Sequence, residues 1–144
     1  LRGELGAAEW KVLWPQRGAA AFQPGNDLSV IVEIGEGDVP RSLFLGDLSA
    51  EAQRMLMRTA NIRGAFDVVK VAHHGSADQD AGLYEALRPV AAIISVGAGN
   101  DYGHPRDEIL ATLQLIGAHV LRTDLQGRVI VAERDGELQV WTDR

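Results

Sequence analysis

Two adjacent histidines, His73 and His74, stand directly after an apolar run and directly before Gly75 and Ser76. Burying an unpaired polar side chain is costly, so imidazoles that follow a buried strand suit a site at the edge of a sheet. Imidazole binds zinc, manganese or iron, and the alternative for each ring is a hydrogen-bonded structural role. If the strand continues through them, the two side chains point to opposite faces, and one of them at most is a metal ligand.

Two further polar clusters follow apolar runs. Asp47 comes after residues 42–45 and a glycine, and it suits either a metal-bridging carboxylate or a turn and helix-capping role. His104 lies in a glycine-rich loop with Asn100 and Tyr102, just before a predicted helix. There it could bind phosphate or protonate a leaving group, and the alternative is a ring that packs on Tyr102. Ser76 could donate to phosphate, although serine after glycine is common in turns.

The elements that must position these residues alternate between strands and helices. Apolar alternation and β-branched residues predict strands, and Ser49 is a suitable N-cap for the first helix. The order predicts an α/β layered domain, in which ligand sites collect at strand ends. We expect strands over 10–14, 28–34, 42–45, 66–72, 90–96, 119–122, 128–133 and 137–142, helices over 50–59, 83–87 and 106–116, and a loop over 18–25.

Composition sets the class of protein. A chain of 144 residues with 46% apolar and 24% charged residues predicts one globular domain, which we expect to be soluble. The net charge of −6 argues against a basic nucleic-acid surface, although bound divalent cations would supply positive charge where phosphate must lie. The absence of cysteine excludes disulfides and thiolate metal sites. No apolar run is long enough for a membrane helix, and no signal peptide is evident.

Several short segments together resemble a known family. Segments 26–29, 43–47, 69–76, 93–97, 100–105 and 122–127 read NDLS, LFLGD, VKVAHHGS, IISVG, NDYGHP and RTDLQG, in that order. They resemble the C-terminal metallo-β-lactamase-fold domain of ComEC-type proteins, the DNA-uptake channels of competent bacteria. The resemblance covers about residues 10–133, and the His-His-Gly-Ser and Tyr-Gly-His-Pro pieces are specific in combination.

The resemblance implies an αββα sandwich that holds two divalent metal ions, zinc or manganese, and degrades the non-transported DNA strand. By the family pattern Asp47 is the bridging carboxylate, His74 is a histidine ligand, and His73 is the other choice for that ligand. His104 lies at the pocket edge and assists the leaving group. Ser76, Asn100 and Tyr102 are then candidates for binding phosphate. The implied partners are DNA and the rest of a membrane-bound parent protein, with this domain on the outer face.

One departure limits the resemblance. The family's first metal motif, His-x-His-x-Asp-His, occurs nowhere in the 144 residues. We therefore expect the C-terminal half of such a domain, or a degenerate version, that binds metal weakly or not at all and is inactive by itself. A half-domain leaves an apolar sheet face bare, which favours self-association. The alternatives are a non-catalytic DNA-binding or assembly module, and another hydrolase of this fold such as a phosphorylcholine esterase or lactonase.

Overall fold

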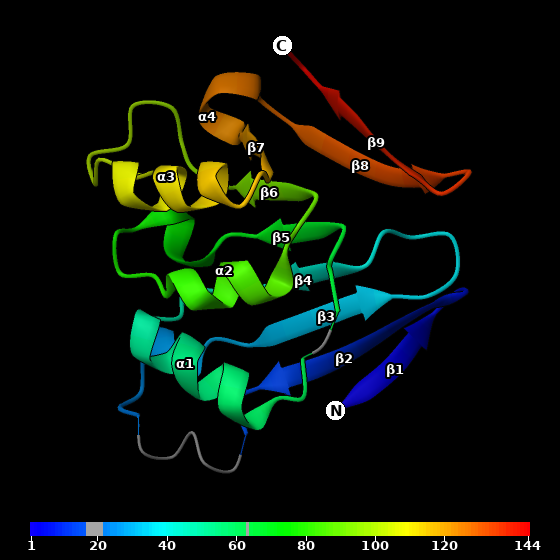
Figure 1. Ribbon diagram of the computed structural model, residues 1–144, viewed down its shortest axis with the longest axis horizontal. Helices are drawn as coiled ribbons and strands as arrows, with labels where there is room; N and C mark the ends of the chain where they lie inside the picture. The colour runs from blue at the N-terminus through cyan, green and yellow to red at the C-terminus, as the bar shows by residue number, and fades with distance from the viewer. Residues whose placement is uncertain (17–21, 63) are drawn as a thin grey trace.

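The strands of the chain form one seven-stranded sheet and a separate hairpin. The computed structural model describes residues 1–16, 22–62 and 64–144. The sheet has the order β1-β2-β3-β4-β5-β6-β7, which is also the order of the sequence, and β8 pairs only with β9 (Figure 1). The strands are β1 Arg2–Leu5, β2 Ala8–Trp14, β3 Ile31–Gly35, β4 Ser42–Phe44, β5 Val68–Lys70, β6 Ala91–Ile94, β7 His119–Arg122, β8 Val129–Arg134 and β9 Glu137–Thr142.

The sheet changes character at β4. Strands β1 to β4 are antiparallel neighbours, whereas β4 to β7 run parallel. Each parallel step passes through a helix: α1 Ala50–Thr59, α2 Ala81–Leu87 and α3 Asp107–Leu115. Crossovers of this kind are right-handed, so three successive ones in one direction put their helices on the same face. Figure 1 shows the three helices side by side over that face.

The core lies between the helices and this face of the sheet. Leu43 from β4, Val69 from β5 and Ile94 from β6 are fully buried there against Leu56 of α1 and Leu113 of α3. Because side chains alternate along a strand, this face is continuous across the parallel strands. The polar turns that follow β4, β5 and β6 therefore emerge together at one edge.

The opposite face of the sheet has no helix over it in the described parts of the chain. The strand register places Val12, Val32, Phe44, Lys70 and Ile93 in one row across five strands. Phe44 is 42% exposed, and the others are only partly buried. Four of the five residues in this row are apolar, so this face is largely apolar and incompletely covered.

The mixed α/β prediction is confirmed, and β3 and β4 form an antiparallel hairpin. Ser49 caps α1 as predicted, because its hydroxyl accepts from the Ala52 N–H at 3.3 Å. The turn at Asp135 and Gly136 joins β8 to β9 as expected. Part of the predicted loop over 18–25 and of the break over 61–64 lies outside the described residues.

Several predicted boundaries were wrong. Strand β1 was not predicted, and residues 123–126 form a short helix, α4 Thr123–Gln126, instead of leading straight to a turn. The strand predicted over 28–34 begins at Ile31, after a 3-10 segment Asn26–Leu28. The strand predicted over 66–72 is only Val68–Lys70. Apolar residues next to these strands are buried by tertiary packing without pairing with a neighbouring strand. A prediction from composition alone therefore makes the strands too long.

The two faces of β4 predict different mutational costs. Leu43→Ala removes a fully buried side chain and is expected to lower the free energy of unfolding by about 2–5 kcal/mol. Phe44→Ala, at the next residue on the open face, should cost less than half as much despite its larger side chain. Urea denaturation of both variants tests this, and equal losses would show that the open face is packed.

Candidate functional site

Asp47 is presented by a tight turn at the end of β4. Gly46 has a φ of +51°, and a Cβ there would lie 2.5 Å from the Ser29 Cβ, so a side chain cannot be accommodated. The Ser29 hydroxyl accepts from the Asp47 N–H at 3.2 Å. The Gly46 carbonyl accepts from the His73 N–H at 2.9 Å and from Lys70 Nζ at 3.4 Å. Burial lowers the pKa of Lys70, while the nearby Asp47 carboxylate raises it.

The two adjacent histidines lie in a turn and not on a strand. After β5 the chain forms the 3-10 segment Ala72–Gly75, in which His73 and His74 have φ values of +44° and +53°. A left-handed backbone costs about 1–3 kcal/mol at each residue other than glycine, so the surrounding contacts must impose it. The strand does not continue through the two histidines, so their rings do not alternate across the sheet. Both rings stand at the same edge, with centroids 6.5 Å apart.

The His74 ring is oriented by a main-chain carbonyl. Its Nδ1 lies 2.6 Å from the Ser95 carbonyl oxygen, which can only accept, so Nδ1 carries the proton. The neutral ring then has its lone pair on Nε2, which lies 3.7 Å from the Asp47 Oδ1. The side chains of His74 and Asp47 are 47% and 35% exposed. Metal-binding histidines are commonly oriented in this way, with the far N–H on a carbonyl.

A buried polar network holds the two turns together. Gln79 Oε1 accepts from the Tyr84 hydroxyl at 2.7 Å and from Gln53 Nε2 at 3.0 Å, and Gln79 Nε2 donates to the Ala72 carbonyl at 2.8 Å. Gln53 Nε2 also donates to the Leu48 carbonyl at 2.9 Å. The Asp47 turn and the histidine turn are thus fixed to the same three side chains. Burial raises the pKa of Tyr84, so its hydroxyl stays protonated and donates.

His104 reaches the same edge from a separate loop. Its ring centroid is 5.9 Å from that of His73 and 6.0 Å from that of Tyr102. Burial lowers the pKa of His104, and the positive charges of His73, Arg106 and His74 lower it further. A lowered pKa favours the neutral form of the His104 ring at neutral pH.

The loop that carries His104 is tied to the histidine turn. The Arg106 N–H donates to the Gly75 carbonyl at 2.8 Å, and a Cβ on Gly75 would lie 2.7 Å from the Pro105 Cβ. The helix predicted over 106–116 begins at Asp107, with Arg106 as its N-cap. The first turn of α3 contains Asp107 and Glu108, whose charges already complement the helix dipole.

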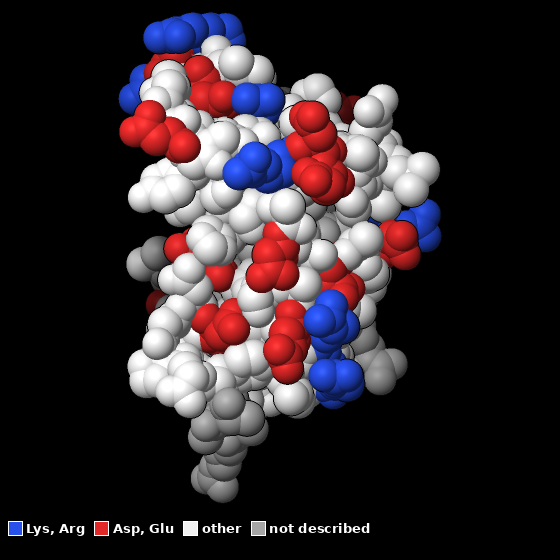
Figure 2. Space-filling model, turned by 90° about the vertical axis from the view of Figure 1, so that its left-hand side faces the viewer, with Lys and Arg blue, Asp and Glu red and all other residues white. Residues whose placement is uncertain are grey.

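Two pockets flank the histidines. The acid-lined pocket, of about 550 Å³, is lined by His73 and by the carboxylates of Asp27, Asp47, Glu51 and Asp78, among others. The histidine–tyrosine pocket, of about 460 Å³, contains no carboxylate, and it is lined by His74, Ser95, Val96, Gly97, Asn100, Tyr102, His104 and Thr123. Figure 2 views this side of the molecule, where acidic groups are separated by wide uncharged areas.

The donor set is too small for a metal site in this chain alone. Asp47 and His74 approach one another with suitable donor atoms, and His73 lies alongside. A catalytic zinc takes three protein ligands. Within residues 1–16, 22–62 and 64–144, no three His, Asp or Glu side chains are grouped so that they could hold a metal ion. Among the described residues, Asp47 and His74 are thus two potential ligands placed close together.

The structure brings most of the predicted residues together. Asp47, His73, His74 and His104 meet at one edge, and Asn100 and Tyr102 line the pocket beside His104. Ser76 is instead buried, and its hydroxyl accepts from Gln79 Nε2 at 3.4 Å.

Sequence reasoning missed three neighbours of the site. Asn26 Nδ2 lies 3.5 Å from His73 Nε2, and the Asp27 carboxylate accepts from the Ser49 N–H at 2.8 Å. The Thr123 hydroxyl accepts from the Val96 N–H at 2.8 Å and so supports the floor of the histidine–tyrosine pocket. Asn26, Asp27 and Thr123 all lie in the short segments that carry the resemblance, which was the available signal.

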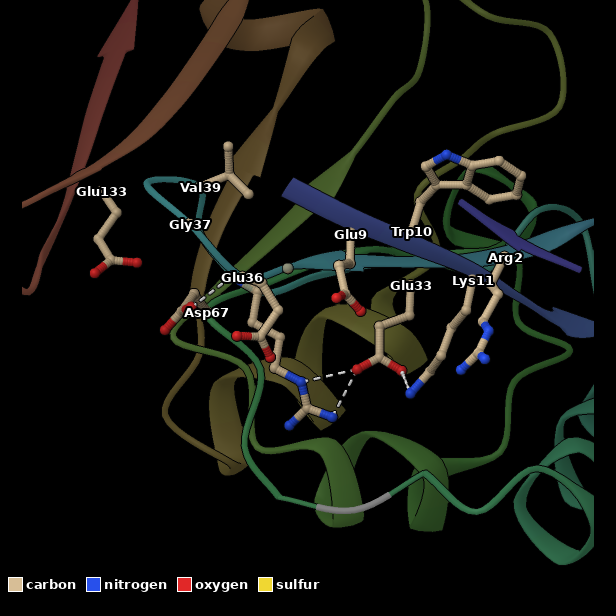
Figure 3. Close-up of a pocket in the computed structure, with 12 residues that line it drawn as sticks. Arg2, Glu9, Trp10, Lys11, Glu33, Glu36, Gly37, Val39, Asp67 and Glu133 are labelled. Atoms are coloured by element: carbon tan, nitrogen blue, oxygen red, sulfur yellow. Dashed lines mark hydrogen bonds and ion pairs between the residues drawn. The ribbon is translucent and has the colours of Figure 1, made fainter. Parts of the chain in front are cut away.

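A third pocket, of about 490 Å³, lies at the opposite edge, where β4 and β5 begin (Figure 3). Glu33 is only 8% exposed there and pairs with Lys11 Nζ at 2.7 Å and Arg41 Nη2 at 2.8 Å. The Arg41 guanidinium also donates to the Ala65 carbonyl and lies 4.0 Å from the centre of the Phe66 ring. Since the central charges are already paired, this cluster joins strands and is not a second candidate site.

The fold and the site define a mixed α/β domain with a histidine- and carboxylate-bearing edge. The chain is 34% identical to ComE operon protein 3 of Bacillus subtilis over 123 residues, 84% of this chain and 15% of that protein. It is 28% identical to Recombination protein 2 of Haemophilus influenzae over 85% of this chain and 15% of that protein. With Competence protein ComA of Neisseria gonorrhoeae it shares 31% identity over 59% of this chain and 12% of the relative.

These relatives indicate a relationship to a competence-associated, ComEC-type family. The chain spans 15% or less of the length of each of them. No protein-family model and no solved structure matches the chain. Among the described residues, no helix has the length and apolar character needed to cross a membrane.

Loss of the Tyr84 hydroxyl should destabilise the site and the fold together. Tyr84→Phe leaves Gln79 Oε1 and the Ala72 N–H without this buried partner, and we expect a loss of about 1–3 kcal/mol in unfolding free energy. Urea denaturation measures it, with Tyr102→Phe as the matched control because that ring is 77% exposed. An unchanged stability in Tyr84→Phe would refute a supporting role for the network.

The pKa of His104 should lie below the ordinary value of about 6.5. Because the folded pKa is lowered, the contribution of His104 to stability is fully present above the pKa of the unfolded chain. It is lost as the pH falls from there toward the folded pKa. Proton NMR titration measures the shift, and His73→Gln should move the pKa of His104 upward while His119→Gln should not. A pKa of His104 at or above 6.5 contradicts this account.

Proposed function

We propose that this chain is part of a metal-dependent phosphodiesterase domain, a nuclease, of a competence DNA-uptake protein. The parent protein would lie in the cell membrane with this domain on the outer face, and would degrade the DNA strand that is not transported. The relatives that bear competence-related names support the setting. The arrangement of His74 and Asp47 supports the chemistry.

The orientation of His74 is the observation that carries the proposal. A histidine that only packed would not need its Nδ1–H fixed at 2.6 Å on the Ser95 carbonyl and its Nε2 directed toward Asp47. The backbone at His73 and His74 is strained, and strain of this kind is retained where the surrounding structure serves a site. The strain is common to both residues, and the orientation of its ring favours a ligand role for His74 over His73.

The proposed complete domain is a metallo-β-lactamase-like αββα sandwich, in which a second sheet would pack on the open apolar face. Val32 and Phe44 are paired on that face, and Phe44 is 42% exposed. Other parts of the parent protein would supply the ligands that this chain lacks. Alternatively, a second copy of the chain would cover the face by self-association.

In the complete domain, Asp47 and His74 would hold one side of a pair of zinc or manganese ions. Such ions generate hydroxide at neutral pH and stabilise the charge that develops on a phosphodiester. His104 would stand at the pocket edge and, once protonated, pass a proton to the leaving oxygen. Asn100 and Tyr102 would lie along the path of the substrate, because both line the adjoining pocket.

The 144-residue chain alone should cleave neither single-stranded nor duplex DNA with Mn²⁺ or Zn²⁺, because its ligand set is incomplete. A longer piece of the parent that restores the ligands should cleave DNA, and Asp47→Asn should reduce that rate at least about 100-fold, in keeping with the cost of losing a group that orients the metal. Gel-based cleavage assays measure both. Glu51→Gln, in the same pocket but exposed on α1, is the control and should cost little.

Metal-dependent cleavage by the isolated chain that disappears in Asp47→Asn would refute the incomplete-site proposal. Full activity of Asp47→Asn in the longer piece would refute the role of Asp47.

A non-catalytic DNA-binding or assembly module is the second candidate. It is favoured by the lack of any group of three potential metal ligands in the described parts of the chain. Such a module would bind single-stranded DNA in the presence of EDTA, and its affinity would be unchanged by Asp47→Ala and His74→Ala. DNA binding that requires metal and is lost in both variants separates the nuclease from this module.

A further inference from the structure

The pockets on either side of the histidines differ in charge, so they are not equivalent as binding sites for an anionic substrate. Four carboxylates line the acid-lined pocket, and none lines the histidine–tyrosine pocket. On a chain with a net charge of −6, an anionic phosphodiester is repelled least where carboxylates are absent. His74 lines the second pocket and stands 3.7 Å from Asp47, so a polynucleotide there would lie directly beside the candidate cleavage site.

An aromatic ring stands at the rim of this pocket. Tyr102 is 77% exposed, and its ring lies 6.0 Å from the His104 ring at an angle of 32°. Covering an exposed aromatic side chain removes a large apolar area from water, so this ring could contribute to binding a ligand in the pocket. The tilt toward His104 leaves Tyr102 next to the pocket and not folded back onto the sheet.

The loop that presents Tyr102 is fixed by its own hydrogen bonds. Asn100 Nδ2 donates to the His104 carbonyl at 2.8 Å, and Asn100 Oδ1 accepts from the His104 N–H at 3.0 Å. Arg106 Nη2 donates to the Tyr102 carbonyl at 3.0 Å. A loop whose backbone is held in place before a ligand arrives loses less conformational entropy on binding.

The other polar groups of the pocket are already engaged. Asn100 uses its amide within the loop, and the Thr123 hydroxyl donates to the Val96 carbonyl at 2.7 Å. The Ser95 carbonyl accepts from His74. A ligand in this pocket therefore contacts the face of an aromatic ring and apolar side chains. Few hydrogen-bonding groups remain that could recognise the edge of a base. Stacking on an aromatic face accepts every base, whereas edge hydrogen bonds discriminate among them.

We propose that the histidine–tyrosine pocket binds one nucleotide of single-stranded DNA, with its base stacked on Tyr102 and its phosphate beside His104 and His74, without base preference. The proposal rests on the proposed function, because it takes the substrate to be a polynucleotide. The pocket volume of about 460 Å³ lies in the usual range of about 300–1,000 Å³ for small ligands. Stacking would select single strands, since the bases of a duplex are already stacked on their neighbours.

The test compares a base-bearing oligonucleotide with an abasic one of equal charge. Hexathymidylate and an abasic hexamer are titrated into the chain in EDTA, with binding followed by NMR shifts of the Tyr102 and His104 rings. We expect hexathymidylate to bind more tightly than the abasic hexamer, and Tyr102→Ala to weaken only the former, by about tenfold or more. Tyr102→Phe and Tyr102→Trp should restore it, and hexa-adenylate should bind within about tenfold of hexathymidylate.

Trp141→Ala is the matched control, because that ring is 51% exposed on β9 and lines none of the three pockets. No binding at millimolar oligonucleotide, equal binding of the abasic hexamer, or unchanged binding in Tyr102→Ala would overturn the proposal. Because EDTA removes any metal, these outcomes are independent of cleavage. A failure of stacking leaves the nuclease assay on Asp47→Asn unaffected, and a failure of that assay leaves the stacking result valid.

Discussion

The buried hydrogen bonds among Gln53, Gln79 and Tyr84 are the constraint on which the candidate site depends. These side chains come from α1, from the loop before α2, and from α2, and they bind the carbonyls of Leu48 and Ala72. The two turns that carry Asp47 and the histidines are joined by one backbone hydrogen bond, from the His73 N–H to the Gly46 carbonyl, and this network adds side-chain hydrogen bonds to both turns. In a low-dielectric interior, losing one member leaves the others unpaired, and the network behaves as a unit.

The candidate site also requires that its residues reach the same edge of the sheet, and the parallel strands provide this. Because β4, β5 and β6 run parallel, the turns that follow them emerge side by side, and residues 26 positions or more apart in the sequence meet there. Within the described residues, the same arrangement leaves the other face of the sheet without helices (Figure 1). Phe44 on that face and Asp47 at the edge are only three residues apart, so anything that packs on the open face lies close to the site.

The alternation of strands and helices could be predicted from the sequence, because hydrophobic periodicity and the Ser49 cap are local signals. The meeting of Asp47, His74 and His104 could be predicted only in outline, from strand ends. The conformation of His73 and His74 could not, because a left-handed turn at two histidines contradicts the local preference and is imposed by distant contacts. The burial of Ser76 and the contact between Asn26 and His73 likewise arise from tertiary packing.

The backbone conformation of His73 and His74 predicts how these two positions would change in evolution if the site were not in use. Glycine or asparagine would adopt the same φ values with less strain, so stability alone favours replacing both histidines. A copy of the domain released from its function would be free to make that exchange and would gain stability by it. The identity of these two residues therefore distinguishes a domain still in use from a decayed one more sensitively than the preservation of its core.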